Sequence, residues 1–207
     1  MPHPFSPGSV AEDLDVSLLP VSRAELSNDL VAIRRPEIVL ANCSRTLPTE
    51  LATALDLLDA ASVDDLAFSI EFPISAAALA MNLVVSGYES ALSRLLAADI
   101  AELATRFAAI TRSTRLAVRL EIVETDACRR FHADHVTYRL LSTYRGQATQ
   151  WIRANEPDDI QHMRTGDVGI FKGRVLAPDT PILHRSPPIA GTGEQRLLLV
   201  IDAVTRD

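Results

Sequence analysis

The sequence predicts an α+β protein in which a mainly helical N-terminal part packs on a β-rich C-terminal barrel or sandwich. In the first part, apolar residues recur at helical spacing; Leu51, Leu55 and Leu58 share one helix face. From Arg115 onward the spacing changes to alternation, and then to short apolar runs separated by Gly, Pro, Asn and Asp. Such runs are typical of an all-β unit.

The elements of the N-terminal part have recognisable ends. Pro36 stops a helix, and Pro48 suits the first turn of the next one. Gly87 interrupts a long Ala/Leu-rich stretch. The expected elements are an irregular arm (1–20), a helix (22–35), a strand (37–42), a helix (47–61), a strand of period two (66–72) and a broken helical stretch (75–112).

The C-terminal part consists of closely spaced expected strands. In RLAVRLEIVET the apolar residues alternate as on a half-buried strand. The runs HVTYRLLSTYRG, GDVGIF, LHRSPP and RLLLVID follow. We therefore divide the chain into an irregular arm (1–20), a mainly helical support region (21–114) and a β-rich core (115–207). No linker separates the last two, which predicts one integrated domain.

The composition excludes several classes of protein. A hydrophobic content of 47% in 207 residues is ample for a folded core, and no apolar run reaches the roughly 18 residues that a bilayer span needs. The two cysteines, Cys43 and Cys128, form no CxxC motif, which argues against a disulfide scaffold or a thiolate zinc site. The N-terminus has no basic, apolar leader, so we expect a cytoplasmic protein.

The net charge of −7 is unevenly distributed along the chain. Residues 1–125 hold 9 basic and 17 acidic side chains, whereas residues 126–207 hold 11 and 10. An acidic region repels nucleic acid, whose binding depends on neutralising phosphates, so we expect no nucleic-acid partner. The cations of the C-terminal part leave room for a local anionic ligand.

A metal site is the chemistry that the C-terminal part predicts. Four of the five histidines lie there: His132, His135, His162 and His184. In FHADH, His132 and Asp134 stand two apart, and residues i and i+2 of a strand project from one face. His184, at the end of another expected strand, supplies a third ligand. Two imidazoles and a carboxylate form the facial triad of non-haem Fe(II) oxygenases, which leaves coordination positions open.

Other side chains compete for roles at this site. His135 replaces His132 as a ligand if the strand register shifts; otherwise it points to the opposite face and is a substrate-pocket candidate. His162 follows an acidic loop and is expected to be exposed. Trp151, the only tryptophan, either packs in the barrel or forms a wall of the substrate pocket. Cys128 is expected as a small buried residue near the site.

Two arginines are candidates for binding an anionic cosubstrate. Arg196 opens the strand RLLLVI, where its guanidinium can pair bidentately with a carboxylate in the barrel mouth. Arg185 directly follows His184 and is the competing anchor; we favour Arg196 for its position on a strand. Three residues stand an even number of positions after His132, so without a bulge in the strand their side chains line the same cavity: Tyr138, Ser142 and Tyr144.

The order HxD, Gly-Asp-strand, His, and Arg opening the last strand resembles the 2-oxoglutarate- and Fe(II)-dependent oxygenases. The resemblance covers about 70 residues, from Phe131 to Ile201. It implies a double-stranded β-helix, a jelly-roll or cupin-like barrel. It also implies that His132, Asp134 and His184 hold Fe(II), and that Arg196 binds the distal carboxylate of 2-oxoglutarate. The TYRG segment lacks the Tyr-Leu-Asn signature of these oxygenases, so the second cosubstrate contact is unassigned.

A second resemblance covers most of the chain. FHADH, TYRGQATQW and HRSPP are similar to motifs of an uncharacterised bacterial family of unknown function. This resemblance implies no established activity.

The expected function is therefore an Fe(II)- and 2-oxoglutarate-dependent oxygenase. The alternative keeps the barrel and binds zinc without redox chemistry, in metal handling or sensing, because two His and one Asp also suit Zn²⁺. A third hypothesis is a metal-free jelly roll used for binding or assembly. No motif identifies the substrate, a small molecule or a protein, and the Ala/Leu-rich helix over 90–110 is a candidate homodimer surface.

Overall fold

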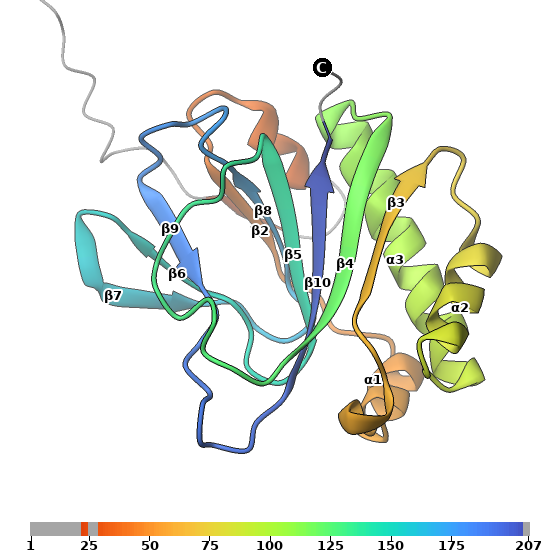
Figure 1. Ribbon diagram of the computed structural model, residues 1–207. Coiled ribbons are helices and arrows are strands. Elements are labelled where there is room, and N and C mark those ends of the chain that lie inside the picture. The colour runs from red at the N-terminus through yellow and green to blue at the C-terminus, as the bar shows by residue number, and fades with distance from the viewer. Residues whose placement is uncertain (1–21, 25–28, 205–207) are drawn as a thin grey trace, which may run out of the picture.

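The computed structural model describes residues 22–24 and 29–204, so the expected arm over 1–20 lies outside the described residues. The described chain has three layers: a small sheet, a large sheet and a group of helices (Figure 1). Within this part of the chain, no helix is both long and apolar enough to cross a membrane.

The large sheet takes strands from both halves of the chain. Its seven strands are β1 (Ser22–Ala24), β2 (Leu40–Cys43), β3 (Leu66–Glu71), β4 (Arg115–Val123), β5 (Tyr138–Arg145), β8 (Val168–Lys172) and β10 (Arg196–Ala203), in the spatial order β1-β2-β8-β5-β10-β4-β3. Only β1 and β2 are parallel neighbours among these described strands. The small sheet is antiparallel, with β6 (Gln150–Arg153) between β7 (Glu156–His162) and β9 (Ile182–Arg185).

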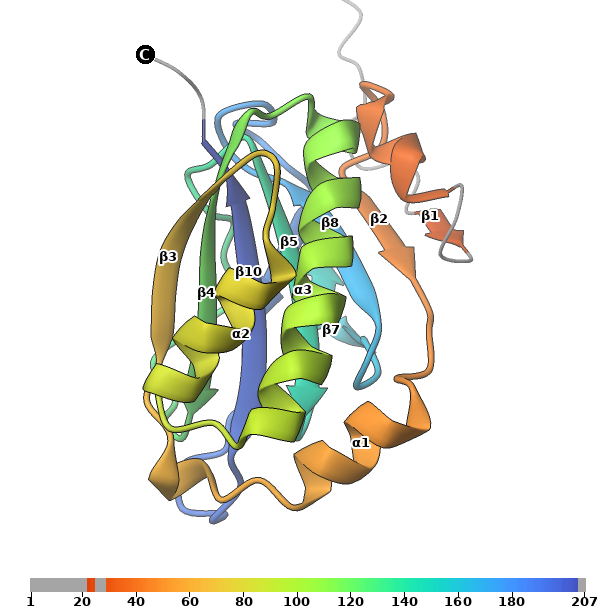
Figure 2. The ribbon, with the colours of Figure 1, turned by 90° about the vertical axis from the view of Figure 1, so that its right-hand side faces the viewer.

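The helices cover the face of the large sheet that is turned away from the small sheet (Figure 2). They are α1 (Thr49–Asp56), α2 (Ala76–Val85) and α3 (Ser90–Thr111). Gly87 lies between α2 and α3 with φ +91°, and a Cβ there would lie 2.5 Å from the carbonyl oxygen of Ser62. This backbone conformation and close approach both require glycine, so the predicted break in the helical stretch is confirmed.

Alternation along the central strand β10 divides the interior into two cores. Leu197, Leu199 and Ile201 pack toward the helices, whereas Leu198 and Val200 pack toward the small sheet. Because successive side chains of a strand point to opposite faces, one buried strand serves both cores. In the space between the two sheets, His184 of β9, one of the candidate metal ligands, packs on Phe171 of β8.

Several expected elements differ from the structure. The helix expected over 22–35 is wrong; β1 is followed, after undescribed residues, by a 3₁₀ helix over Asp29–Arg34. Leu30 and Ile33 are buried, and their i, i+3 spacing suits a 3₁₀ turn. The helix expected over 47–61 is split into α1 and a 3₁₀ turn over Ala60–Ser62. The side chain of Asp59 caps this turn by accepting a hydrogen bond from the amide of Ala61.

Candidate metal centre

The backbone brings the two histidine ligands together directly. The amide of His132 donates to the carbonyl of His184 at 3.0 Å, and the amide of His184 donates back at 2.9 Å. Through this isolated antiparallel bridge, His132 lies beside β9 as a one-residue addition to the edge of the small sheet. The two imidazole rings lie with centroids 4.8 Å apart, and the ring of Phe171 packs on His184 from another side.

Asp134 reaches the site from a loop. The expectation that His132 and Asp134 share a continuous strand is wrong, because only His132 forms a bridge and β5 begins at Tyr138. The Asp134 carbonyl accepts a hydrogen bond of 2.8 Å from the amide of Arg174. At the neighbouring Gly173 a Cβ would lie 2.2 Å from the carbonyl oxygen of Val136, so glycine permits the close packing that holds this loop.

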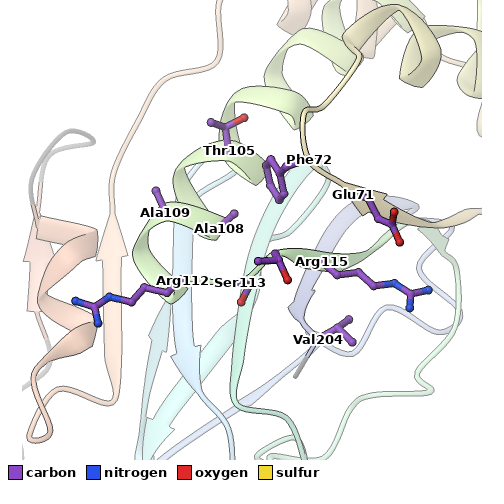
Figure 3. Close-up of a pocket in the computed structure, with 10 residues that line it drawn as sticks. Glu71, Phe72, Thr105, Ala108, Ala109, Arg112, Ser113, Arg115 and Val204 are labelled. Atoms are coloured by element: carbon purple, nitrogen blue, oxygen red, sulfur yellow. The ribbon is translucent and has the colours of Figure 1, made fainter. Parts of the chain in front are cut away.

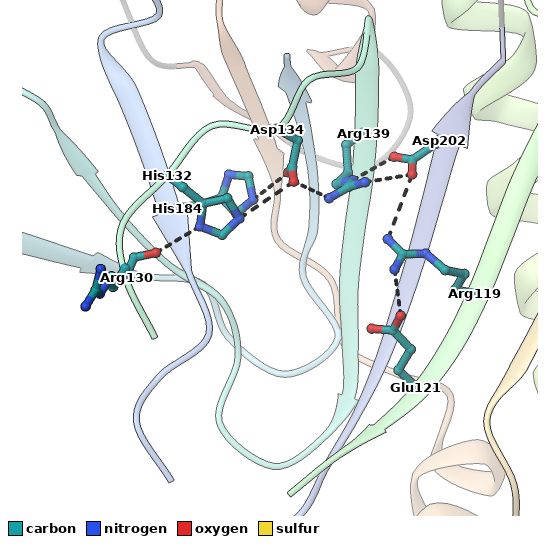
Figure 4. A network of polar contacts seen from close by, with 8 residues as sticks. All are labelled: Arg119, Glu121, Arg130, His132, Asp134, Arg139, His184 and Asp202. Carbon is teal, nitrogen blue, oxygen red and sulfur yellow. Dashed lines mark hydrogen bonds and ion pairs between the residues drawn. The ribbon is translucent and has the colours of Figure 1, made fainter. Parts of the chain in front are cut away.

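The ligand atoms form a compact cluster. One donor atom from each of His132, Asp134 and His184 lies within 4.8 Å of the others. Asp134 Oδ2 is 3.0 Å from His184 Nε2, and Asp134 Oδ1 is 3.6 Å from His132 Nε2 (Figure 4). His135 does not join this group; its side chain is exposed.

The donor set fits a divalent metal ion. His132 Nδ1 lies 2.8 Å from the carbonyl oxygen of Arg130. A carbonyl only accepts, so Nδ1 carries the proton and the Nε2 lone pair faces the cluster. Asp134 Oδ2 is buried and receives no hydrogen bond of acceptable geometry from the described part of the chain. A buried carboxylate oxygen facing an imidazole nitrogen is costly by itself and is satisfied by a cation between them.

The ionisation states suit metal binding. Burial alone raises the pKa of Asp134, but the contacts with His132 and His184 and the charge of Arg139 outweigh it, so the pKa lies well below its usual range. Burial lowers the pKa of His184, which favours the neutral imidazole that binds metals. The contact with Asp134 raises the pKa of His132.

Arg196 is buried between the sheets. Its side chain donates to the Gln147 carbonyl at 2.5 Å, the Ser186 hydroxyl at 2.7 Å and the Thr143 hydroxyl at 3.5 Å. Within the described chain, no carboxylate forms an ion pair with it. Burial lowers the pKa of Arg196 to about 10, and the guanidinium is still charged at neutral pH. It is therefore a buried cation in contact with neutral oxygens only.

A strand relation links Arg196 to the metal ligands. Ser186, which accepts from Arg196, stands two residues after His184. Residues i and i+2 of an extended chain lie on one face about 6.6 Å apart. The guanidinium thus contacts the side chain that stands two residues beyond a candidate metal ligand.

Comparison with known families identifies the chain. A family model described as "Protein of unknown function (DUF1826)" matches residues 24–202. The chain belongs to this family. No curated protein matches it.

Solved structures share the fold of this DUF1826 chain. The rice dioxygenase for auxin oxidation aligns over 91% of this chain and 84% of its own, with a TM-score of 0.51 and 12% identity. The Arabidopsis thaliana dioxygenase for auxin oxidation 1, in a binary complex with 2-oxoglutarate, aligns over 92% and 94%, with a TM-score of 0.51 and 11% identity. At this identity the similarity establishes a shared mixed helix-and-sheet fold.

The competing arginine of the DUF1826 chain points elsewhere. Arg185 follows His184 on β9, so its side chain leaves the opposite face of the strand. It stacks on the ring of Phe131 at 4.2 Å and donates to the Gln150 side chain at 2.7 Å. The structure therefore places Arg196, and not Arg185, between the sheets.

The expected cavity lining by Tyr138, Ser142 and Tyr144 is wrong. Tyr138 and Tyr144 pack in the helix-side core, and the Tyr144 hydroxyl donates to Asp99 of α3 at 2.6 Å. Ser142 pairs with Leu199, which faces the same core. Parity cannot be counted from His132 to β5, because the intervening residues form no strand.

The other expected site residues have mixed positions. Trp151 is buried in the core between the sheets, and in β6 it pairs with His184 of β9. Its indole nitrogen has no hydrogen-bond partner among the described residues. His162 is exposed as predicted. Cys128 is exposed, not buried, and no disulfide joins it to Cys43.

Sequence reasoning missed four residues that complete the site: Thr143, Ser186, Arg139 and Asp202. The two hydroxyls contact the Arg196 guanidinium, and Arg139 contacts Asp134. Arg139 and Thr143 flank Leu141 at alternate positions of β5, and this polar pattern in a buried strand was a usable signal. The contact between Arg139 and Asp202 depends on strand register and had no local signal.

A hollow next to the site is smaller than another one elsewhere in the described molecule. Residues 126–130 and His132 line a hollow of about 380 Å³ beside the exposed edge of that ligand. A larger hollow, of about 1030 Å³, lies at the C-terminal end of α3 between Phe72 and Arg115 (Figure 3). None of the three candidate ligands lines it, so size alone does not locate the chemistry.

Proposed function

We propose that this chain is an Fe(II)- and 2-oxoglutarate-dependent oxygenase acting on an unidentified substrate. The observation that carries the proposal is the buried Arg196 guanidinium. It forms no ion pair with a carboxylate of the described chain, and it donates to Ser186, two residues after His184 of the His-Asp-His cluster. Such a cation matches the free carboxylate of a dicarboxylic cosubstrate. The fold shared with the 2-oxoglutarate-bound Arabidopsis protein supports the same conclusion. We infer that the two sheets are the halves of a double-stranded β-helix.

The chain's residues have separable tasks in this proposal. His132, Asp134 and His184 hold the metal by three donors and leave its remaining positions open. Arg196, oriented by Ser186 and the Gln147 carbonyl, fixes the far end of 2-oxoglutarate.

Apolar walls, including Phe171 and Trp151, limit the access of water to the space between the sheets. When bound, Fe(II) supplies the redox chemistry in which dioxygen and 2-oxoglutarate give succinate, CO₂ and a hydroxylated substrate.

Anaerobic titration tests the proposal. Fe(II) is added to one equivalent, followed by 2-oxoglutarate, and the visible spectrum is recorded for a metal-to-ligand charge-transfer band. We expect the band in the wild type and its loss in His132→Ala, Asp134→Ala and His184→Ala. His162→Ala, which removes an exposed histidine away from the cluster, is the matched control and should retain the band.

Three outcomes contradict the oxygenase assignment. A folded, iron-loaded protein that shows no band with 2-oxoglutarate excludes this cosubstrate. One equivalent of zinc in protein purified without a His-tag, with no effect of 2-oxoglutarate, supports the non-redox metal-binding alternative, since Zn²⁺ accepts the same donors and binds more tightly than Fe²⁺. If the three ligand substitutions leave metal content and thermal stability unchanged, the metal-free alternative is correct.

A further inference from the structure

Arg139 connects a metal ligand to the centre of the large sheet. Its Nη1 lies 2.5 Å from Asp134 Oδ1, while its Nε and Nη2 donate to the two carboxylate oxygens of Asp202 at 2.6 and 2.7 Å (Figure 4). All three side chains are largely buried, with 15 to 17% of their surface exposed. A bidentate arginine–carboxylate pair has a fixed geometry, so the third contact of Arg139 has a fixed direction.

The sheet register fixes the base of this arrangement. Asp202 of β10 and Arg139 of β5 are direct cross-strand partners, so ladder hydrogen bonds on both sides hold their backbones. Arg119 lies 3.9 Å from Asp202 and is itself paired with Glu121 at 2.7 Å. The pair therefore belongs to the rigid part of the molecule.

Unlike Arg139 and Asp202, Asp134 is not held by the ladder hydrogen bonds of a strand. It lies in a loop, and its side-chain direction is set by what it contacts. Arg139 engages Oδ1, and Oδ2 remains directed toward His184 without a hydrogen bond. A carboxylate with one oxygen held in this way offers only the other oxygen to an ion.

We propose that Arg139 is a positioning residue that fixes Asp134 as a monodentate metal ligand through Oδ2, with Asp202 holding Arg139 in place. The inference rests on the metal centre of the proposed function but not on 2-oxoglutarate. Asp202 has a second, electrostatic role. It balances the charge of Arg139, so that the negative charge of Asp134 remains available to the metal.

Two opposing effects decide the result of removing Arg139. Loss of a nearby cation favours metal binding, whereas loss of ligand orientation opposes it. Partners that orient ligands typically contribute about 10- to 100-fold to metal affinity, and Asp202 already offsets the charge of Arg139. We therefore expect the loss of orientation to dominate.

Cobalt(II) binding under anaerobic conditions tests the inference without enzyme activity. We expect Arg139→Met to bind Co(II) roughly 10- to 100-fold more weakly than the wild type. We also expect an altered visible Co(II) spectrum, because a released Asp134 can bind through both oxygens. Arg139→Lys should recover part of the affinity. Quenching of the single tryptophan, Trp151, gives an independent binding curve because it pairs with His184.

The chain offers a matched control on the helix side of the sheet. Arg45 forms a similar buried bidentate pair with Asp99 of α3, at 2.5 and 2.9 Å. Arg45→Met should lower stability but keep the wild-type Co(II) affinity and spectrum. Asp202→Asn preserves shape while removing the balancing charge, and should weaken Co(II) binding even if Arg139→Met does not fold.

The outcomes separate the inference from the metal centre. Wild-type Co(II) affinity and spectrum in folded Arg139→Met, or in Asp202→Asn, overturn the positioning role while the metal centre stands. An equal loss of affinity in Arg45→Met also overturns it, because the effect then follows stability alone. Absence of Co(II) binding to the wild type overturns both the metal centre and this inference.

Discussion

Burying the Arg196 side chain costs free energy that a purely stabilising role does not explain. Arg196 is 1% exposed, and its contacts within the described chain are to neutral oxygens. Moving a guanidinium out of water is costly unless a charged partner compensates it. Gly146, with φ +79°, lets the backbone pass close to this side chain, where a Cβ would lie 3.0 Å from Arg196 Cγ. The local structure therefore holds a buried cation, and a bound anion would supply its missing charged partner.

This arrangement predicts the effect of Arg196→Met, which keeps an apolar stem and removes the charge. Affinity for 2-oxoglutarate should fall at least ~10-fold, since hydrogen bonds to charged groups contribute ~1.5–3 kcal/mol. Fe(II) binding should be retained. The gain from removing a buried charge offsets the lost hydrogen bonds, so the free energy of unfolding should change by less than ~2 kcal/mol. The charge-transfer band and denaturant unfolding measure the two effects.

Arg185→Met is the companion variant, because Arg185 lies on the outer face of β9. It should keep 2-oxoglutarate affinity close to the wild-type value. The reverse result, with affinity lost in Arg185→Met and kept in Arg196→Met, would move the anion site to the other side of the strand.

At the scale of elements, the sequence predicted what depends on local pattern. The alternation of Leu116, Val118 and Leu120 correctly indicated β4, with these residues facing the helices. The 3₁₀ helix over 29–34 was missed. Its buried pair, Leu30 and Ile33, has a spacing of three residues, which fits an α-helical turn and a 3₁₀ turn equally well. Within a strand, parity is a reliable guide to side-chain direction, and across a loop it is not.

The ligands illustrate the same limit. His132 and Asp134 were chosen by strand parity, yet they converge through a single bridge to His184 and a loop packed on Gly173. Their chemistry was readable from the sequence, but their geometry was not. The contact between Arg139 and Asp202 spans 63 positions, and only the register of β5 against β10 creates it.

Helix α3 is the element whose packing on the large sheet is most easily tested. Leu96 lies at its centre with 0% exposure, whereas Met81 on α2 is 64% exposed. Leu96→Ala should lower the free energy of unfolding by ~2–5 kcal/mol, because it leaves a cavity in the core. Met81→Ala should change it by less than ~0.5 kcal/mol. Equal denaturant midpoints for the two variants would contradict the packing of α3 on the sheet.

At the scale of the whole molecule, one sheet separates a stabilising core from a functional one. The core toward the helices is apolar apart from groups such as the Arg45–Asp99–Tyr144 cluster. The space between the sheets holds the charged groups, including Arg139 and Arg196. Stability and chemistry therefore depend largely on different faces of the same strands, and substitutions on the two faces should separate them.

The three tyrosines of the chain report on the helix-side core. Tyr88 and Tyr144 are buried, Tyr138 is partly buried, and burial raises the pKa of each phenol. In the unfolded chain a tyrosine ionises near ~pH 10. Above that pH the unfolded state binds fewer protons than the folded state, so stability is fully present below ~pH 10 and falls as the pH rises.

We therefore expect phenolate absorbance to rise together with alkaline unfolding. Only Tyr138, which is partly exposed, should contribute phenolate absorbance before the protein unfolds. Tyr144→Phe removes one titrating group and should make the fall in the free energy of unfolding above ~pH 10 shallower. Absorbance at alkaline pH, followed in parallel with circular dichroism, measures both transitions. Full phenolate absorbance near ~pH 10 in a protein with native dichroism would mean that this core is open to water.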